Sequence, residues 1–207
     1  MRHRSKLLLA ALAAALAIGS LAQTASGSRL SLSERAATWS WLPFTIGSSA
    51  LAINLGCNIT LSGSFHSSTF AKTTGALIGH ITRAAIEPCI FGAATILLNS
   101  LSWNRRFGRW TSSLPRISTV TTSVVGLSIR IDPDGIVPAC LFRTTTENPA
   151  VFIDNIDAEG NVTGTTADPT AQIPLSEGFG SGMFEAYLEG TATPVTPGGG
   201  RLRWRLI

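Results

Sequence analysis

Lysine is nearly missing from this 207-residue chain, which contains only Lys6 and Lys72, and all charged residues together make up 14%. Three basic residues, at positions 2, 4 and 6, lie in the first 22 residues, and the remainder holds 13 basic and 12 acidic residues. The net charge of +4 is therefore poor support for nucleic-acid binding, since no dense basic cluster follows those first residues. We expect no nucleic-acid partner.

Long apolar runs are also rare, and the clearest one extends from Leu7 to Ile18. A basic head precedes it, and Ser20 and Ala22 place small residues three and one positions before a cleavage point. This order is typical of a secretory signal peptide, and the run is too short to indicate a membrane anchor. The sequence predicts a signal peptide over residues 1–22, a secreted or cell-envelope protein, and no transmembrane segment in the mature chain.

The rest of the chain has the length of one ordinary domain and can bury a real core. Residues 23–38 are polar and rich in serine, without a clear period, and we expect a flexible entry segment there. Residues 39–207 are then expected to form a single β domain.

Short runs of alternating apolar and polar residues, broken by Gly, Pro, Asn and Ser, fill that domain. Residues 58–65 alternate with period two, as a strand with one buried face does. Val151 to Ile156 and Val162 to Thr166 flank a turn-like segment and predict a hairpin. We therefore expect an all-β, mainly antiparallel fold, either a β-sandwich or a small closed β-barrel, with at most one short helix.

The sequence pattern of residues 73–86 is compatible with either a strand or a short helix. Leu77, Ile81 and Ala85 recur at four-residue spacing, which favours a helix. Gly75 and Gly79 oppose it, because each glycine costs about 1 kcal/mol in a helix interior.

The chain has only three cysteines, Cys57, Cys89 and Cys140, and export makes one disulfide the expectation. Three pairings are possible. We favour Cys89–Cys140, because each of these residues closely follows a proline at an apparent strand start. Cys57 is then left over, either buried or available for a bond between chains.

Residues arranged for catalysis are scarce, and we assign none. The mature part has two histidines, His66 and His80, and lacks a Gly-x-Ser-x-Gly elbow, which Ser181 only partly resembles. A glycosidase needs two carboxylates that act together as acid and base or nucleophile. The carboxylates of this chain fall in predicted turns or at strand edges, where acidic residues are common because they form local hydrogen bonds, so they do not indicate such a pair.

Metal and cofactor sites also find little support. Asp154 to Asn161 places oxygen ligands at alternate positions, as the front of a calcium loop does, but lacks the closing glutamate. No two Cys or His residues stand at a spacing typical of zinc ligands. We expect neither a metal nor a cofactor.

One segment combines aromatic rings with cations and is the best ligand candidate. Arginine forks there can bind phosphates, and exposed rings can stack on sugars. The alternative is a purely structural role, in which the segment is a hairpin whose tryptophans are buried while its arginines stay in water. The candidate ligand-binding residues are Trp103, Arg105, Arg106, Arg109 and Trp110.

Several stretches together resemble a set of functionally uncharacterised secreted, mostly-β proteins of high-GC bacteria. The resemblance rests on five pieces and the chain end: Ile59 to His66, Gly75 to Gly79, Ala94 to Leu97, Leu114-Pro115, Glu147 to Ala150 and Arg205 to Ile207. It implies a shared fold and export, and it carries over no functional residue.

These observations predict a secreted or envelope-associated, non-catalytic protein with a binding or structural role. We expect its partner to be a polymer or protein of the cell envelope, and the oligomeric state stays open. The alternative is a secreted hydrolase whose site is assembled from residues distant in sequence, with His66 or His80 as the base.

Overall fold

A computed structural model describes residues 29–113, 116–132, 139–178 and 183–207 of the chain. The predicted signal peptide and Ser181 lie outside these ranges. Strands begin at Arg29, ten residues earlier than the expected start of the domain, so residues 29–32 and 36–38 of the segment expected to be flexible lie in strands. Leu30 is completely buried there.

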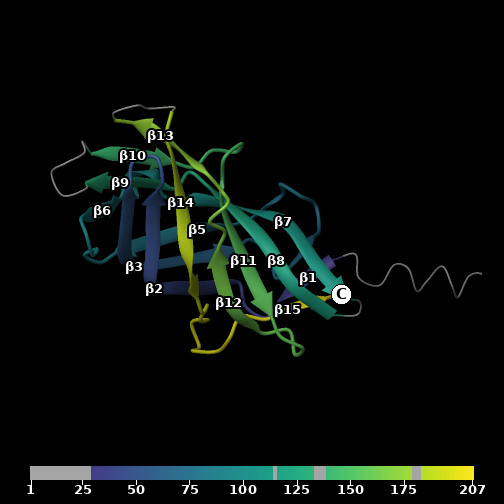
Figure 1. Cartoon of the computed structure of the whole chain (residues 1–207). Coiled ribbons are helices and arrows are strands. Elements are labelled where there is room, and N and C mark those ends of the chain that lie inside the picture. Colours follow the sequence, from purple (N-terminus) through teal and green to yellow (C-terminus); the bar gives the residue numbers. More distant parts are fainter. Residues whose placement is uncertain (1–28, 114–115, 133–138, 179–182) are drawn as a thin grey trace, which may run out of the picture.

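The fold is all-β, as predicted, and its main body is a closed antiparallel barrel rather than a sandwich (Figure 1). Around the barrel the described strands follow the order β12-β11-β8-β7-β5-β3-β2-β14, and β12 pairs with β14 to close the ring. Their bounds are β2 Ala36–Ser48, β3 Ile53–Phe65, β5 Leu77–Ile86, β7 Trp103–Ser113, β8 Arg116–Val125, β11 Ala150–Ile156, β12 Val162–Ala167 and β14 Glu185–Ala192.

Two smaller groups of strands extend this barrel. Beyond β14 the sheet continues through β13 (Ile173–Glu177), β10 (Cys140–Arg143), β9 (Ser128–Asp132) and β6 (Ala93–Ile96). A separate sheet has the order β15-β1-β4, with bounds Trp204–Leu206, Arg29–Leu32 and Thr69–Ala71. The short helix allowed by the sequence is a 3-10 turn, Leu98–Ser100, whereas the ambiguous segment 73–86 contains strand β5.

Alternation along each strand explains why the barrel closes around a filled core. In β2, Trp39 and Trp41 are buried while Ser40 between them is exposed, and β3 repeats this pattern with Ile59 and Leu61. Small barrels of eight strands have an interior just wide enough for side chains to fill. The described side chains form one continuous buried cluster through the barrel.

The β15-β1-β4 sheet covers one end of the barrel. Trp204 of β15 is buried, and its ring meets Phe65 and Phe70 edge to face, with centroids 5.8 and 5.4 Å apart. The indole N–H also donates a hydrogen bond to the carboxylate of Asp154 inside the barrel.

The disulfide joins Cys57 to Cys89, so the predicted Cys89–Cys140 pairing is wrong. The pairing of β3 with β5 carries the chain after β5 back along β3, and Ile90 N–H donates to the Gly56 carbonyl at 2.8 Å. The Cα atoms of Cys57 and Cys89 thereby come within 4.2 Å. Cys140 instead lies buried in β10, paired with Ile131 of β9.

The hairpin predicted after residue 150 is confirmed, because β11 and β12 pair directly. Its turn is closed by Asp157, whose carboxylate accepts hydrogen bonds from the backbone N–H of Glu159 and Asn161 at 3.0 and 2.8 Å. The described residues contain no helix long and apolar enough to cross a membrane.

Candidate functional site

Strand β7 divides the predicted Arg/Trp segment between the two sides of the barrel wall. Trp103 and Arg105 are buried, whereas Arg106 is half-buried and Arg109 is exposed. A bulge between Phe107 and Arg109 shifts the register against β8. The segment is therefore not one continuous face, since alternate residues of a strand point to opposite sides of the sheet.

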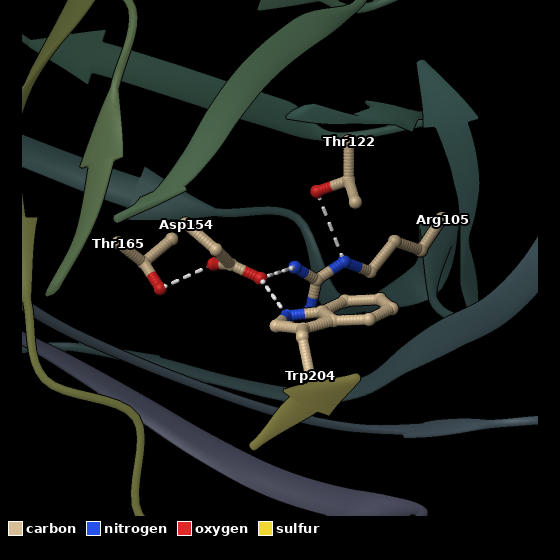
Figure 2. Close-up of polar contacts among 5 residues, drawn as sticks. All are labelled: Arg105, Thr122, Asp154, Thr165 and Trp204. Atoms are coloured by element: carbon tan, nitrogen blue, oxygen red, sulfur yellow. Dashed lines mark hydrogen bonds and ion pairs between the residues drawn. The ribbon is translucent and has the colours of Figure 1, made fainter. Parts of the chain in front are cut away.

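Arg105 lies inside the barrel and is only 4% exposed (Figure 2). Its Nε donates to Thr122 Oγ1 at 3.1 Å, and its Nη2 lies 3.5 Å from Asp154 Oδ2. Burial lowers the pKa of the Arg105 guanidinium, and the charge of Asp154 partly opposes this effect. The guanidinium stays protonated, since arginine does not lose its proton in proteins.

Asp154 is completely buried and accepts bonds from three sides. Thr165 Oγ1 donates to its Oδ1 at 2.6 Å, and Trp204 Nε1 donates to its Oδ2 at 3.0 Å. Figure 2 shows these groups converging on the carboxylate from β12, β15 and β7. The same network reaches β8 through the Arg105–Thr122 bond. It therefore connects the β15-β1-β4 sheet, which we call the end sheet, to the barrel strands β7, β8, β11 and β12.

Aromatic rings surround the remaining sides of the guanidinium. Arg105 Cζ lies 4.5 Å from the ring centroid of Trp39 and 4.9 Å from that of Phe65, within the range of cation–π attraction. A cavity of about 10 Å³ borders Arg105 and Trp41, which is no more than the space one water needs. Arg105 therefore serves the interior of the barrel and is not presented to an outside ligand.

Trp103 and Trp110 also face inward. Trp103 is completely buried and donates to Ser100 Oγ at 2.9 Å. Trp110 is partly buried, and the Lys72 ammonium lies 4.3 Å from its ring centroid. Arg106 and Arg109 are thus the members of the predicted set that lie on the outer side of the wall, and Arg106 Nη1 donates to the Gly75 carbonyl at 3.2 Å.

The outer face over β7, β8, β11, β12 and β14 carries rows of hydroxyl and amide groups. In one row Arg109 pairs with Thr121, Thr121 with Ile153, Ile153 with Thr166, and Thr166 with Thr191. The neighbouring row is Thr111, Thr119 and Asn155. We call these two rows the hydroxyl face.

Hydrogen bonds run across the strands of the hydroxyl face. Asn155 Nδ2 donates to Thr166 Oγ1 at 3.2 Å, and Thr166 and Thr191 hydroxyls lie 3.2 Å apart. Thr111 and Thr119 hydroxyls lie 2.6 Å apart. A hydroxyl has one donor and two acceptor sites, so each of these groups keeps further capacity for a ligand.

His66 and His80 meet on the outside of the barrel, although they are 14 residues apart. His66 Nε2 and His80 Nδ1 lie 2.8 Å apart, with ring planes inclined at 50°. The sequence did not reveal this pair, because it depends on the register between β3 and β5. Neither imidazole bonds a hydroxyl, thiol or carboxylate within the described part of the chain, so the contacts that a hydrolase with a histidine base needs find no support here.

The calcium-like sequence Asp154 to Asn161 is not arranged around one point. Asp154 faces the barrel interior, whereas Asp157 bonds its own turn. In the described ranges, no group of three or more His, Cys, Asp and Glu side chains is placed to hold a metal ion.

Comparison of the chain with protein-family models, with curated proteins and with solved structures gave no match.

Proposed function

We propose that this protein is a secreted or envelope-associated, non-catalytic binding protein, and that the hydroxyl face binds a polymer of the cell envelope. The observation that supports this proposal is the register of β7, β8, β11, β12 and β14, which sets Arg109 at the end of a row with Thr121, Thr166 and Thr191. Neighbouring strands lie about 4.8 Å apart, so the row offers donors and acceptors at multiples of this spacing, with Ile153 as an apolar position between Thr121 and Thr166.

Peptidoglycan has the chemistry that such a face would recognise. Its sugar hydroxyls and amides match the threonine hydroxyls and Asn155, and its peptide carboxylates match the guanidinium of Arg109. Arg109 is exposed and forms no ion pair with an acidic side chain of the described residues, so its charge can attract an outside anion.

The hydrogen-bonded network around Arg105 and Asp154 inside the barrel should make the strands under the hydroxyl face rigid. Thr122, Asp154 and Thr165, which hold Arg105 and Trp204 inside the barrel, alternate along β8, β11 and β12 with residues of the hydroxyl face. Packing and hydrogen bonds fix the inner side of these strands. The side chains of the hydroxyl face therefore keep their spacing in the absence of ligand.

Co-sedimentation of the purified full chain with insoluble peptidoglycan tests the proposal. We expect the parent chain to sediment with the polymer and Arg109→Glu combined with Thr166→Val to bind at least about tenfold more weakly, the loss of one charge-assisted hydrogen bond or more. Arg83→Glu is the matched control, because Arg83 is an exposed arginine on β5, away from the hydroxyl face. Equal losses in both variants, or no sedimentation of the parent chain, would refute the proposal.

A further inference from the structure

We infer that His66 and His80 form a surface site for a divalent late transition metal, Cu(II) above all. The inference is independent of the hydroxyl face, because His66 directly follows β3 and His80 lies in β5. It rests on the distance between two imidazole nitrogens, on the rigid backbone that sets this distance, and on the chemistry of the ligands.

The distance between the nitrogens matches a pair of adjacent ligands on one metal ion. His66 Nε2 and His80 Nδ1 are 2.8 Å apart. Two nitrogens about 2.0 Å from a metal and at right angles to each other are about 2.8 Å apart, whereas a tetrahedral ion would hold them about 3.3 Å apart. Right angles are typical of tetragonal Cu(II) and Ni(II), and Cu(II) has the highest affinity among the divalent ions of the series.

The backbone holds the two histidines in place without help from a metal. Ser64 pairs with His80 and Phe65 with Gly79, and His66 N–H donates to the Ile78 carbonyl at 2.9 Å. A side chain on Gly79 would collide with the Ser64 carbonyl oxygen, so glycine allows the two strands to approach closely here. Ligands that are already in position lose little freedom when a metal binds.

Two irregularities of β5 flank His80. The register with β3 shifts between Ser62 and Gly63, and the register with β7 shifts between Leu77 and Gly79. Bulges of this kind re-aim side chains and are enriched beside functional sites. Here they accompany an outward-facing His80 whose Cα partners are Ser64 on one side and Asn104 on the other.

Solvent reaches the pair, which allows a metal to enter and water to complete its coordination. His66 is exposed and His80 is half-buried. The oxygen atoms of Ser64 and Asn104 belong to residues in register with His80 and can hold metal-bound waters through hydrogen bonds. In the metal complex each imidazole is neutral, binds the metal through the nitrogen that faces its partner, and carries its proton on its other ring nitrogen.

Titration of the full chain with CuSO₄, followed by electron paramagnetic resonance, tests the inference. The chain has one further histidine, His3, and His3→Ala is carried in every sample so that it cannot take the metal. We expect saturation at one Cu(II) per chain, with hyperfine splitting from two imidazole nitrogens, and weaker binding of Zn(II) than of Cu(II).

His66→Ala and His80→Ala, each made separately, serve as matched variants because each leaves one histidine in place. We expect each to weaken Cu(II) binding at least about tenfold while the thermal midpoint of the metal-free chain stays unchanged. Binding that survives either substitution, a signal from a single nitrogen in the parent, or no saturation at one equivalent would overturn the inference. Arg109→Glu is expected to keep full Cu(II) binding, which separates this site from the hydroxyl face.

Discussion

Trp204 Nε1 donates a hydrogen bond of 3.0 Å to Asp154 Oδ2, and this bond joins the last strand of the chain to the centre of the barrel. The two residues are 50 positions apart and both are almost completely buried. The same carboxylate is the partner of Arg105, so one acidic group holds the end sheet and the barrel wall together.

Trp204→Phe keeps an aromatic ring in the core and removes the hydrogen bond to Asp154. We expect it to lower the free energy of unfolding by about 1–3 kcal/mol, the cost of leaving a buried charged acceptor without one donor. Urea unfolding followed by circular dichroism measures this. Trp110→Phe is the control, since Trp110 is only partly buried and donates no hydrogen bond to any carboxylate within the described ranges. An equal loss in both variants would show that ring size, and not the bond, matters.

The Arg105–Asp154 pair is expected to behave as one unit. Arg105→Met or Asp154→Leu alone leaves a buried charge without its partner, and we expect each to cost about 3–5 kcal/mol. The double variant should lose clearly less than the sum, because it removes both charges. A double-mutant cycle by urea unfolding measures the difference. Additive losses would contradict the buried ion pair.

Asp157 is expected to stabilise the β11–β12 turn in a pH-dependent way. The Asn161 side chain, followed by the backbone N–H groups of Asn161 and Glu159, lowers the pKa of this carboxyl. A group whose pKa falls on folding stabilises the fold above its unfolded value of about 3.9, and the contribution is lost as the pH falls through the folded value.

Asp157→Ala should therefore lower the thermal midpoint at pH 7, by a difference that shrinks as the pH falls below the unfolded value of about 3.9. Scanning calorimetry across this range measures it, with Glu159→Ala as the control on the same turn. A difference that does not change with pH would mean that the carboxylate charge contributes nothing.

The cysteines should differ sharply in reactivity. Digestion without reduction is expected to yield a peptide pair that contains Cys57 and Cys89, whose removal would cost about 3–4 kcal/mol for a loop of 32 residues. Burial, followed by the charge of Asp132, raises the pKa of the Cys140 thiol. Iodoacetamide at pH 8 should therefore modify Cys140 slowly in the native chain and rapidly in urea. A peptide pair that contains Cys140 would contradict the structure.

The fold class could be predicted from the sequence because it depends on local alternation. Period two in residues 58–65 and the turn after Ile156 are both readable one strand at a time. The choice of a closed barrel over a sandwich could not be predicted, since the ring closes only when β14 pairs with both β12 and β2, and the β2–β14 partners Ile46 and Leu188 are 142 positions apart. The Cys57–Cys89 bond depends in the same way on the β3–β5 register.

The candidate site was harder to predict, and Arg105 shows why. An arginine beside two tryptophans is usually exposed, and only the carboxylate of Asp154, 49 positions later, makes its burial tolerable. Alternation along β7 does separate Arg105 from Arg106, a signal that the sequence contains. The His66–His80 contact has no such signal, because a bulge within β5 sets it.

The most direct test of the central proposal is to map backbone amide chemical shifts while soluble peptidoglycan fragments are added to the isotope-labelled chain. We predict shifts for Arg109, Thr121, Thr166 and Thr191 and their neighbours on β7, β8, β11, β12 and β14, with His66 and His80 unaffected. Shifts confined to another face of the barrel, or none at saturating fragment, would contradict a binding role for the hydroxyl face.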